Sequence, residues 1–356
     1  MTIQREQGQF PLMEANQLVA GLMKPNPKTY WLDFLISISL GWAGFALALM
    51  NPWVSWAGIA GLVLSTFALY RAVLFTHELT HLKTGTFKVF RFVWNILCGF
   101  ALLIPAFTYH GVHRHHHVHD VYGTKADGEY LPFGTSHPFG LIGYMLLIFI
   151  LPGFFVVRFM VLAPLSWALP PLRRLVWSRL SSLTIDPAYI RPMPGAKDPK
   201  FLWAAQEFMA FAYGWVACAL VWFGWLPAKA LVLWYAIAVL IFFLNSLRTL
   251  AAHAYRNSGE EQLTVPEQFL DSVDIPGHPV LTTLWAPVGL RFHATHHLFP
   301  RMPYHNLPRA YDILRDGLSD NTMFLLASRK SLAHALVRIW KDAAQANRTR
   351  KAQPAE

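Results

Sequence analysis

The sequence predicts an all-α integral membrane protein with two transmembrane helical hairpins (four spans), interfacial helices and a cytoplasmic helical cap that holds a dimetal site. Three observations support this fold class. The 356 residues are 54% hydrophobic and only 14% charged, whereas soluble domains carry about a quarter charged residues. Four apolar runs occur in two pairs, each run close to the length of a membrane-crossing helix. Three histidine clusters interrupt this otherwise apolar chain.

The first predicted hairpin pairs residues 30–50 with residues 53–75 across the turn Asn51-Pro52. A helix of about 20 apolar residues crosses a bilayer core of roughly 30 Å. Basic residues precede the first run and follow the second, and the turn carries no charge. The positive-inside rule therefore places both ends of the hairpin in the cytoplasm. Residues 1–29 form a cytoplasmic N-terminal segment that lacks the apolar core of a signal peptide.

The second predicted hairpin pairs residues 208–226 with residues 230–247, and Lys229 is the one basic residue expected outside. The last run leaves the membrane on the cytoplasmic side, just before His253. Residues 311–356 are expected to form a cytoplasmic C-terminal helix and a basic tail, disordered from Gln345 onward. The net charge of +10 fits a cytoplasmic excess of Lys and Arg better than nucleic-acid binding.

Two further apolar stretches are expected to lie in the interface or to be re-entrant. Residues 89–107 separate the first two histidine clusters, so they cannot cross the membrane once if these clusters meet at one site. Residues 139–169 contain two prolines and Arg158, and a charge at mid-bilayer is costly. Residues 30–310 are therefore expected to form a single membrane domain.

The histidine clusters are residues 77–81 (HELTH), 113–117 (HRHHH) and 293–297 (HATHH). Residues three and four apart share one face of a helix, so each cluster can direct its imidazoles at one point. With His253 as a further candidate beyond the last span, the predicted metal ligands are His77, His81, His113, His116, His117, His253, His293, His296 and His297.

This donor set suits two ions, because eight or nine imidazoles are too many for one. Nitrogen donors favour iron, zinc, copper or nickel over magnesium and calcium. The two cysteines, Cys98 and Cys218, are far apart and exclude a thiolate site. Cleavage of an unactivated C–H bond, the task of a redox-active pair of irons, is chemistry that a cofactor must supply.

The three clusters together resemble those of the membrane fatty acid desaturase and hydroxylase family. Residues 296–307 (HHLFPRMPYHNL) are especially similar to the acyl-lipid desaturase branch. The resemblance extends from about residue 30 to 310. In acyl-CoA desaturases a further histidine ligand lies in an Asn-x-x-x-His pattern; His253 matches that histidine, but Thr249 stands at the asparagine position.

The resemblance implies two non-haem irons, dioxygen as co-substrate and a double bond introduced into a long-chain acyl lipid. Oxygen transfer to the same carbon would instead give a hydroxylase, and the clusters do not decide between these outcomes. No catalytic residue is expected beyond the metal ligands. The electron donor is expected to be a separate ferredoxin-type or cytochrome b5-type protein, since no fused His-Pro-Gly-Gly segment is present. A bacterial inner membrane is expected, with both termini and the active site facing the cytoplasm.

Two other readings compete. Residues 77–81 also match the zinc-metalloprotease pattern, in which two histidines hold zinc and Glu78 activates water, but this leaves the other clusters unexplained. A metal store or pH sensor is the non-enzymatic alternative. Glu78, and Asp120 or Asp127, are candidates to orient the imidazoles. The remaining histidines are expected to be solvated, supporting or structural: His110, His115, His119, His137, His278, His305 and His334.

Overall fold

The computed structural model describes residues 10–83, 85–259 and 261–352, and these fall into two compact units. We call residues 27–113 and 146–244 the span unit, and residues 10–26, 114–145 and 245–352 the terminal unit. The described residues form helices and contain no strand, only isolated bridges. The predicted all-α fold class is confirmed.

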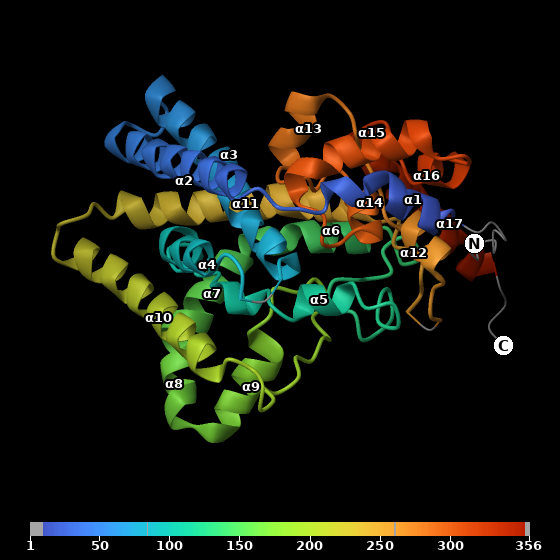
Figure 1. Ribbon diagram of the computed structural model, residues 1–356. Coiled ribbons are helices and arrows are strands. Elements are labelled where there is room, and N and C mark those ends of the chain that lie inside the picture. The colour runs from blue at the N-terminus through green and yellow to red at the C-terminus, as the bar shows by residue number, and fades with distance from the viewer. Residues whose placement is uncertain (1–9, 84, 260, 353–356) are drawn as a thin grey trace. The chain divides into compact units, whose positions relative to one another are not determined.

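The span unit contains α2 (Pro27–Met50) and α3 (Trp56–His81), which lie side by side as an antiparallel hairpin (Figure 1). Glycine allows the two helices to approach closely. A Cβ atom at Gly44 would lie 2.6 Å from the Ser65 nitrogen, and one at Gly61 would lie 2.5 Å from the Ala48 nitrogen. Small residues have this role wherever helices pack within a membrane.

Polar contacts join the hairpin near its two ends. Arg71 of α3 donates to both carboxylate oxygens of Asp33 at 2.6 and 2.5 Å. At the other end, the Lys229 ammonium donates to the carbonyl oxygens of Ala48 at 2.6 Å and of Asn51. The last carbonyls of a helix have no partner within it. Lys229 therefore satisfies the C-terminus of α2 and attaches it to the start of α11 (Lys229–Ala252).

Five helices among the described residues are long and apolar enough to cross a membrane. Four of them contain most of the predicted spans: α2, α3, α10 (Lys200–Trp222) and α11. The fifth is Leu151–Ala168, built from α7 (Leu151–Val156), a π-helical turn (Val157–Leu162) and α8 (Ala163–Ala168). The number of spans stays a prediction. By length and composition, Leu151–Ala168 could be a fifth span, although we expected this stretch to be interfacial or re-entrant.

Arg158, the residue that argued against a fifth span, has a partner that the sequence did not reveal. Arg158 lies in the π-helical turn and is fully buried. Its guanidinium donates to the Glu207 carboxylate of α10 at 2.6 Å. Arg173 of α9 (Pro170–Leu180) donates to the second oxygen of the same carboxylate at 2.6 Å. The cost of burying a charge falls when it is paired and hydrogen-bonded.

The stretch 89–107 forms only a short helix, α4 (Lys88–Trp94), which continues as a π-helical turn (Asn95–Gly99). A helix of this length is too short to cross a bilayer. That the stretch is interfacial or re-entrant stays a prediction.

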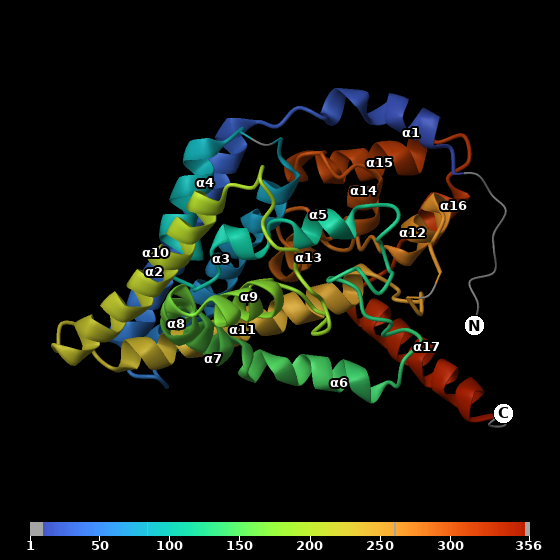
Figure 2. The same ribbon diagram turned by 90° about the horizontal axis from the view of Figure 1, so that it is seen from below.

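The terminal unit is built from short helices: α6 (Phe139–Leu146), the end of α11, α12 (Val265–Asp271), α13 (Pro279–Trp285), α14 (His293–Leu298), α15 (Leu307–Gly317) and α16 (Thr322–Leu326). The N-terminal α1 (Leu12–Val19) runs along α15 (Figure 2) and buries Ala15 and Val19 in the core of this unit. That core continues through Phe269, Phe292 and Phe324.

The final helix, α17, extends over Leu332–Ala352. Our expectation of disorder from Gln345 onward is therefore wrong as far as Ala352, and residues 353–356 lie outside the described part of the chain. Helix propensity explains the difference, because the stretch from Gln345 to Ala352 contains no glycine or proline.

Candidate metal centre

The terminal unit brings four histidines to one point: His116, His253, His293 and His297, the four-histidine group. One ring nitrogen of each lies within 4.8 Å of those of the other three. The Nε2 atom of His253 lies 3.3 Å from Nε2 of His116 and 2.9 Å from Nε2 of His293. The Nε2 atoms of His293 and His297 are 3.1 Å apart. The same nitrogen of every ring thus faces a common centre.

Local structure explains how these side chains are presented. His293 and His297 are one turn apart on α14, and His116 ends α5 (Val112–His116). His253 follows α11 directly and forms an isolated bridge with Ser272. Every ligand of this group therefore lies on a helix or within one residue of a helix end.

Asp274 anchors α14. Its carboxylate accepts hydrogen bonds from the Thr295 hydroxyl at 2.6 Å and from the Thr295 backbone nitrogen at 3.1 Å. The first N–H groups of a helix have no partner within it, and a carboxylate there is stabilising. Burial nevertheless raises the pKa of Asp274 to about 7, against the effect of these hydrogen bonds.

Asp127 orients His116. The Nδ1 atom of His116 lies 2.8 Å from a carboxylate oxygen of Asp127, and both side chains are buried. Burial alone would lower the pKa of His116, but the nearby Asp127 carboxylate reverses this effect and raises it above the ordinary value. Of the two aspartates considered from the sequence, Asp127 contacts a predicted ligand. Asp120 lies exposed and bonds to His119 and Gln262.

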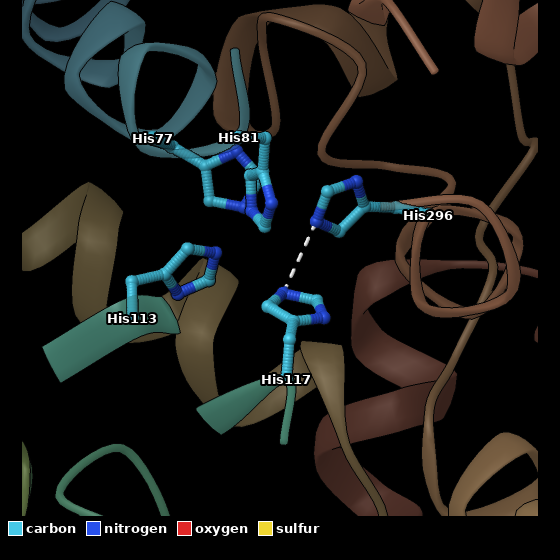
Figure 3. Close-up of side chains that lie close together, drawn as sticks. All are labelled: His77, His81, His113, His117 and His296. Carbon is cyan, nitrogen blue, oxygen red and sulfur yellow. Dashed lines mark hydrogen bonds between the residues drawn. The ribbon is translucent and has the colours of Figure 1, made fainter. Parts of the chain in front are cut away.

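In the span unit, His77, His81 and His113 form a three-histidine group (Figure 3). Their ring centroids are 4.9 Å apart for His77 and His81, 4.3 Å for His77 and His113, and 4.7 Å for His81 and His113. His77 and His81 are one turn apart at the end of α3. Nδ1 of His113 lies 3.0 Å from the Tyr109 hydroxyl.

Glu78 lies beside this group. One of its oxygens is 3.9 Å from Nδ1 of His77, and the other accepts a hydrogen bond from the Tyr30 hydroxyl at 2.7 Å. Both contacts are buried within the hairpin of α2 and α3. Glu78 is thus placed to support His77, as the sequence suggested.

The last two predicted ligands, His117 and His296, form a pair in the terminal unit. Their Nε2 atoms are 3.3 Å apart, as the dashed line in Figure 3 shows. Burial lowers the pKa of His296 to about 3, so its ring is neutral at physiological pH.

The donor set fits metal binding. Burial also lowers the pKa values of His253 and His297 well below the ordinary range. A metal ligand must present an unprotonated nitrogen, and these rings are neutral without any cost of deprotonation. Clustered imidazoles without thiolates suit a dimetal site of iron, zinc, copper or nickel.

The remaining histidines lie apart from these groups or support other structure. Nδ1 of His278 accepts from the backbone nitrogens of Val280 and Leu281 and caps α13. Nε2 of His305 accepts from the Asn26 backbone nitrogen at 3.1 Å. His115 and His119 are exposed on and just after α5. The hydroxyl of Thr249, the residue that replaces the asparagine of the related pattern, accepts from Arg248 at 3.0 Å.

Four supporting residues were not found from the sequence: Tyr109, Tyr122, Asp271 and Asp274. The hydroxyl of Tyr122 contacts Asp271, which is 149 positions away in the chain. No spacing rule predicts such a contact. Only the tertiary fold brings these side chains to the ligands.

The apolar helices and the buried histidine groups fit a membrane metalloprotein, and comparison with known proteins assigns the family. A model of the fatty acid desaturase family matches residues 51–326. The chain belongs to this family, which confirms the resemblance stated from the three clusters. It is also 38% identical over 342 residues to a ceramide hydroxylase of Caulobacter vibrioides, and the alignment covers 96% of each chain.

Proposed function

We propose that this protein is an oxygen-dependent lipid hydroxylase with two non-haem irons, and that its substrate is a ceramide-class lipid. The observation that supports this most strongly is the 38% identity to a ceramide hydroxylase over 96% of both chains. Desaturation of a long-chain acyl lipid, which the sequence favoured, is the second candidate. The family match supports that outcome equally, because family membership does not select between oxygen transfer and hydrogen removal.

The nine predicted histidines are proposed to hold both irons. The four-histidine group supplies one ion with a complete imidazole set. The three-histidine group is proposed to supply ligands to the second ion.

Two irons bound there would activate dioxygen, the oxidant that cleavage of an unactivated C–H bond requires. The protein residues have a different task. The buried rings provide neutral nitrogens, and the Asp127 carboxylate fixes the Nδ1 proton of His116 so that Nε2 faces the ion. Buried aromatic side chains around the four-histidine group, including Tyr122 and Tyr255, keep water away.

The electron donor is proposed to be a separate acidic protein of the ferredoxin or cytochrome b5 type. The net charge of +10 supports attraction of such a partner. The proposed location is a bacterial inner membrane with the metal centre at the cytoplasmic face.

The test is a lipid profile of bacterial cells that contain ceramide and express either the unaltered protein or the His296→Ala variant. Under isotopically heavy dioxygen, we expect a ceramide that has gained one heavy oxygen atom, only with the intact histidine. A product that has lost two hydrogens and gained no oxygen would contradict hydroxylation and support desaturation. Absence of any histidine-dependent product in cells that also express a donor would contradict both candidates.

A further inference from the structure

A buried tyrosine connects the predicted ligand His253 to a carboxylate. Nδ1 of His253 lies 2.8 Å from the Tyr122 hydroxyl oxygen. The same hydroxyl donates to Oδ2 of Asp271 at 3.0 Å. His253, Tyr122 and Asp271 are 5%, 1% and 2% exposed, so water does not compete for these contacts.

The direction of the hydrogen bonds follows from the chemistry of the groups. A phenol has one proton, and an ionised carboxylate can only accept. Because Tyr122 donates to Asp271, its oxygen is left to accept from His253, and that requires a proton on Nδ1. Ser272 does not change this assignment. Its hydroxyl donates to the Gln268 carbonyl oxygen at 3.1 Å, and its oxygen lies 3.4 Å from Nδ1 of His253.

A neutral imidazole with its proton on Nδ1 has its lone pair on Nε2. This is the nitrogen of His253 that lies 2.9 Å from His293 and 3.3 Å from His116 at the centre of the four-histidine group. Asp271 is itself held in place, because its other oxygen accepts from the Arg256 backbone nitrogen at 3.0 Å.

We propose that Tyr122 is a positioning residue. Its hydroxyl connects the Asp271 carboxylate to His253 by two hydrogen bonds and fixes the tautomer in which Nε2 binds metal. The arrangement is the counterpart of the direct bond between Asp127 and His116, with a phenol inserted between carboxylate and imidazole. The inference rests on the proposed function only in requiring that His253 binds a metal ion.

The chain offers a matched control. Tyr255 is also fully buried, and its ring packs against His253 at 5.3 Å between centroids, close to the 5.6 Å of Tyr122. Its hydroxyl, however, donates to the Thr249 carbonyl oxygen at 2.9 Å and not to a ring nitrogen of His253. Tyr122→Phe and Tyr255→Phe therefore each remove one buried hydroxyl beside the same histidine, and only the first interrupts the connection to Asp271.

The experiment titrates metal-free, full-length protein in lipid nanodiscs with Fe²⁺ in competition with a coloured chelator, without dioxygen, lipid substrate or donor. We expect two ions per chain for the unaltered protein and for Tyr255→Phe. In Tyr122→Phe one of the two should bind about 10- to 100-fold more weakly, the effect typical of a lost partner of a metal-binding histidine. When Co²⁺ is the probe, the visible spectrum of one of the two bound ions should differ from that in the unaltered protein for Tyr122→Phe, and it should not differ for Tyr255→Phe.

A second variant keeps the test decisive if Tyr122→Phe melts well below Tyr255→Phe in the metal-free state. Asp271→Asn retains an oxygen that can accept a hydrogen bond from Tyr122 but removes the negative charge. It should weaken the binding of the same ion. Equal affinities in all variants, or equal losses in Tyr122→Phe and Tyr255→Phe, would overturn the proposal.

The outcomes separate this inference from the proposed function. If the metal titration gives the expected pattern but the lipid profile shows no oxidised lipid, only the proposed hydroxylase function is overturned. If two ions bind tightly and their affinities are unchanged in Tyr122→Phe, only the positioning role of Tyr122 is overturned. Failure of the unaltered protein to bind Fe²⁺ or Co²⁺ would overturn both.

Discussion

Asp274 shows how a single residue links the metal site to stability. Its pKa of about 7 in the folded protein exceeds the value of about 3.9 expected in the unfolded chain. A raised pKa means that the stability contributed by the protonated group is complete below about pH 4 and is lost as the pH rises to about 7. Asp274→Asn removes this titration. We therefore expect the melting temperature of the variant, relative to the unaltered protein, to rise with pH and to level off above about pH 7.

The melting curves should be recorded on metal-free protein, because metal binding to α14 would add its own pH dependence. Asp120→Asn is the control, because Asp120 is exposed and its hydrogen bonds to His119 and Gln262 lower the pKa of its carboxyl, so that its titration lies below this pH range. If the difference in melting temperature between the Asp274→Asn variant and the unaltered protein stays constant from about pH 4 to 8, the prediction is contradicted.

At the scale of an element, the hairpin of α2 and α3 depends on close approach. Gly44→Ala would place a Cβ atom 2.6 Å from the backbone nitrogen of Ser65, so the helices must separate. We expect a loss of about 1–3 kcal/mol, as for other overpacked sites, measured by thermal unfolding in nanodiscs. Gly140→Ala in α6 is the matched control, because nothing lies within 4 Å of its added Cβ. That substitution should be neutral or stabilising by up to about 1 kcal/mol. Equal effects of both substitutions would contradict the account.

At the scale of the whole molecule, the excess of basic residues predicts salt-sensitive reduction. The rate at which an acidic ferredoxin reduces the protein should fall steeply as ionic strength rises, because screening shortens the range of attraction. Stopped-flow measurement of the second-order rate constant checks this. Reduction by an uncharged chemical reductant should change little over the same range. A donor rate that is independent of salt would rule out electrostatic attraction.

The sequence predicted those features that depend on local pattern. Apolar runs located α2, α3, α10 and α11, although α3 continues through His81 where we expected the span to end at residue 75. Helical spacing grouped the histidines, and the position of His253 just beyond the last apolar run made it a further candidate. The contacts of Tyr122 with Asp271 and of Arg158 with Glu207 could not be predicted, because each joins residues far apart in the chain. Tertiary packing decides such pairs, and one sequence contains no record of it.

The ion pair of Arg158 and Glu207 has a consequence for biosynthesis. The two residues are 49 positions apart, so at roughly 5–20 residues per second the ribosome adds the carboxylate some seconds after the guanidinium. During that interval the segment Leu151–Ala168 carries an uncompensated charge, which costs about 2.5–3.5 kcal/mol at the centre of a bilayer. If this segment is a fifth span, its stable entry into the lipid is therefore expected only after α10 reaches the insertion machinery.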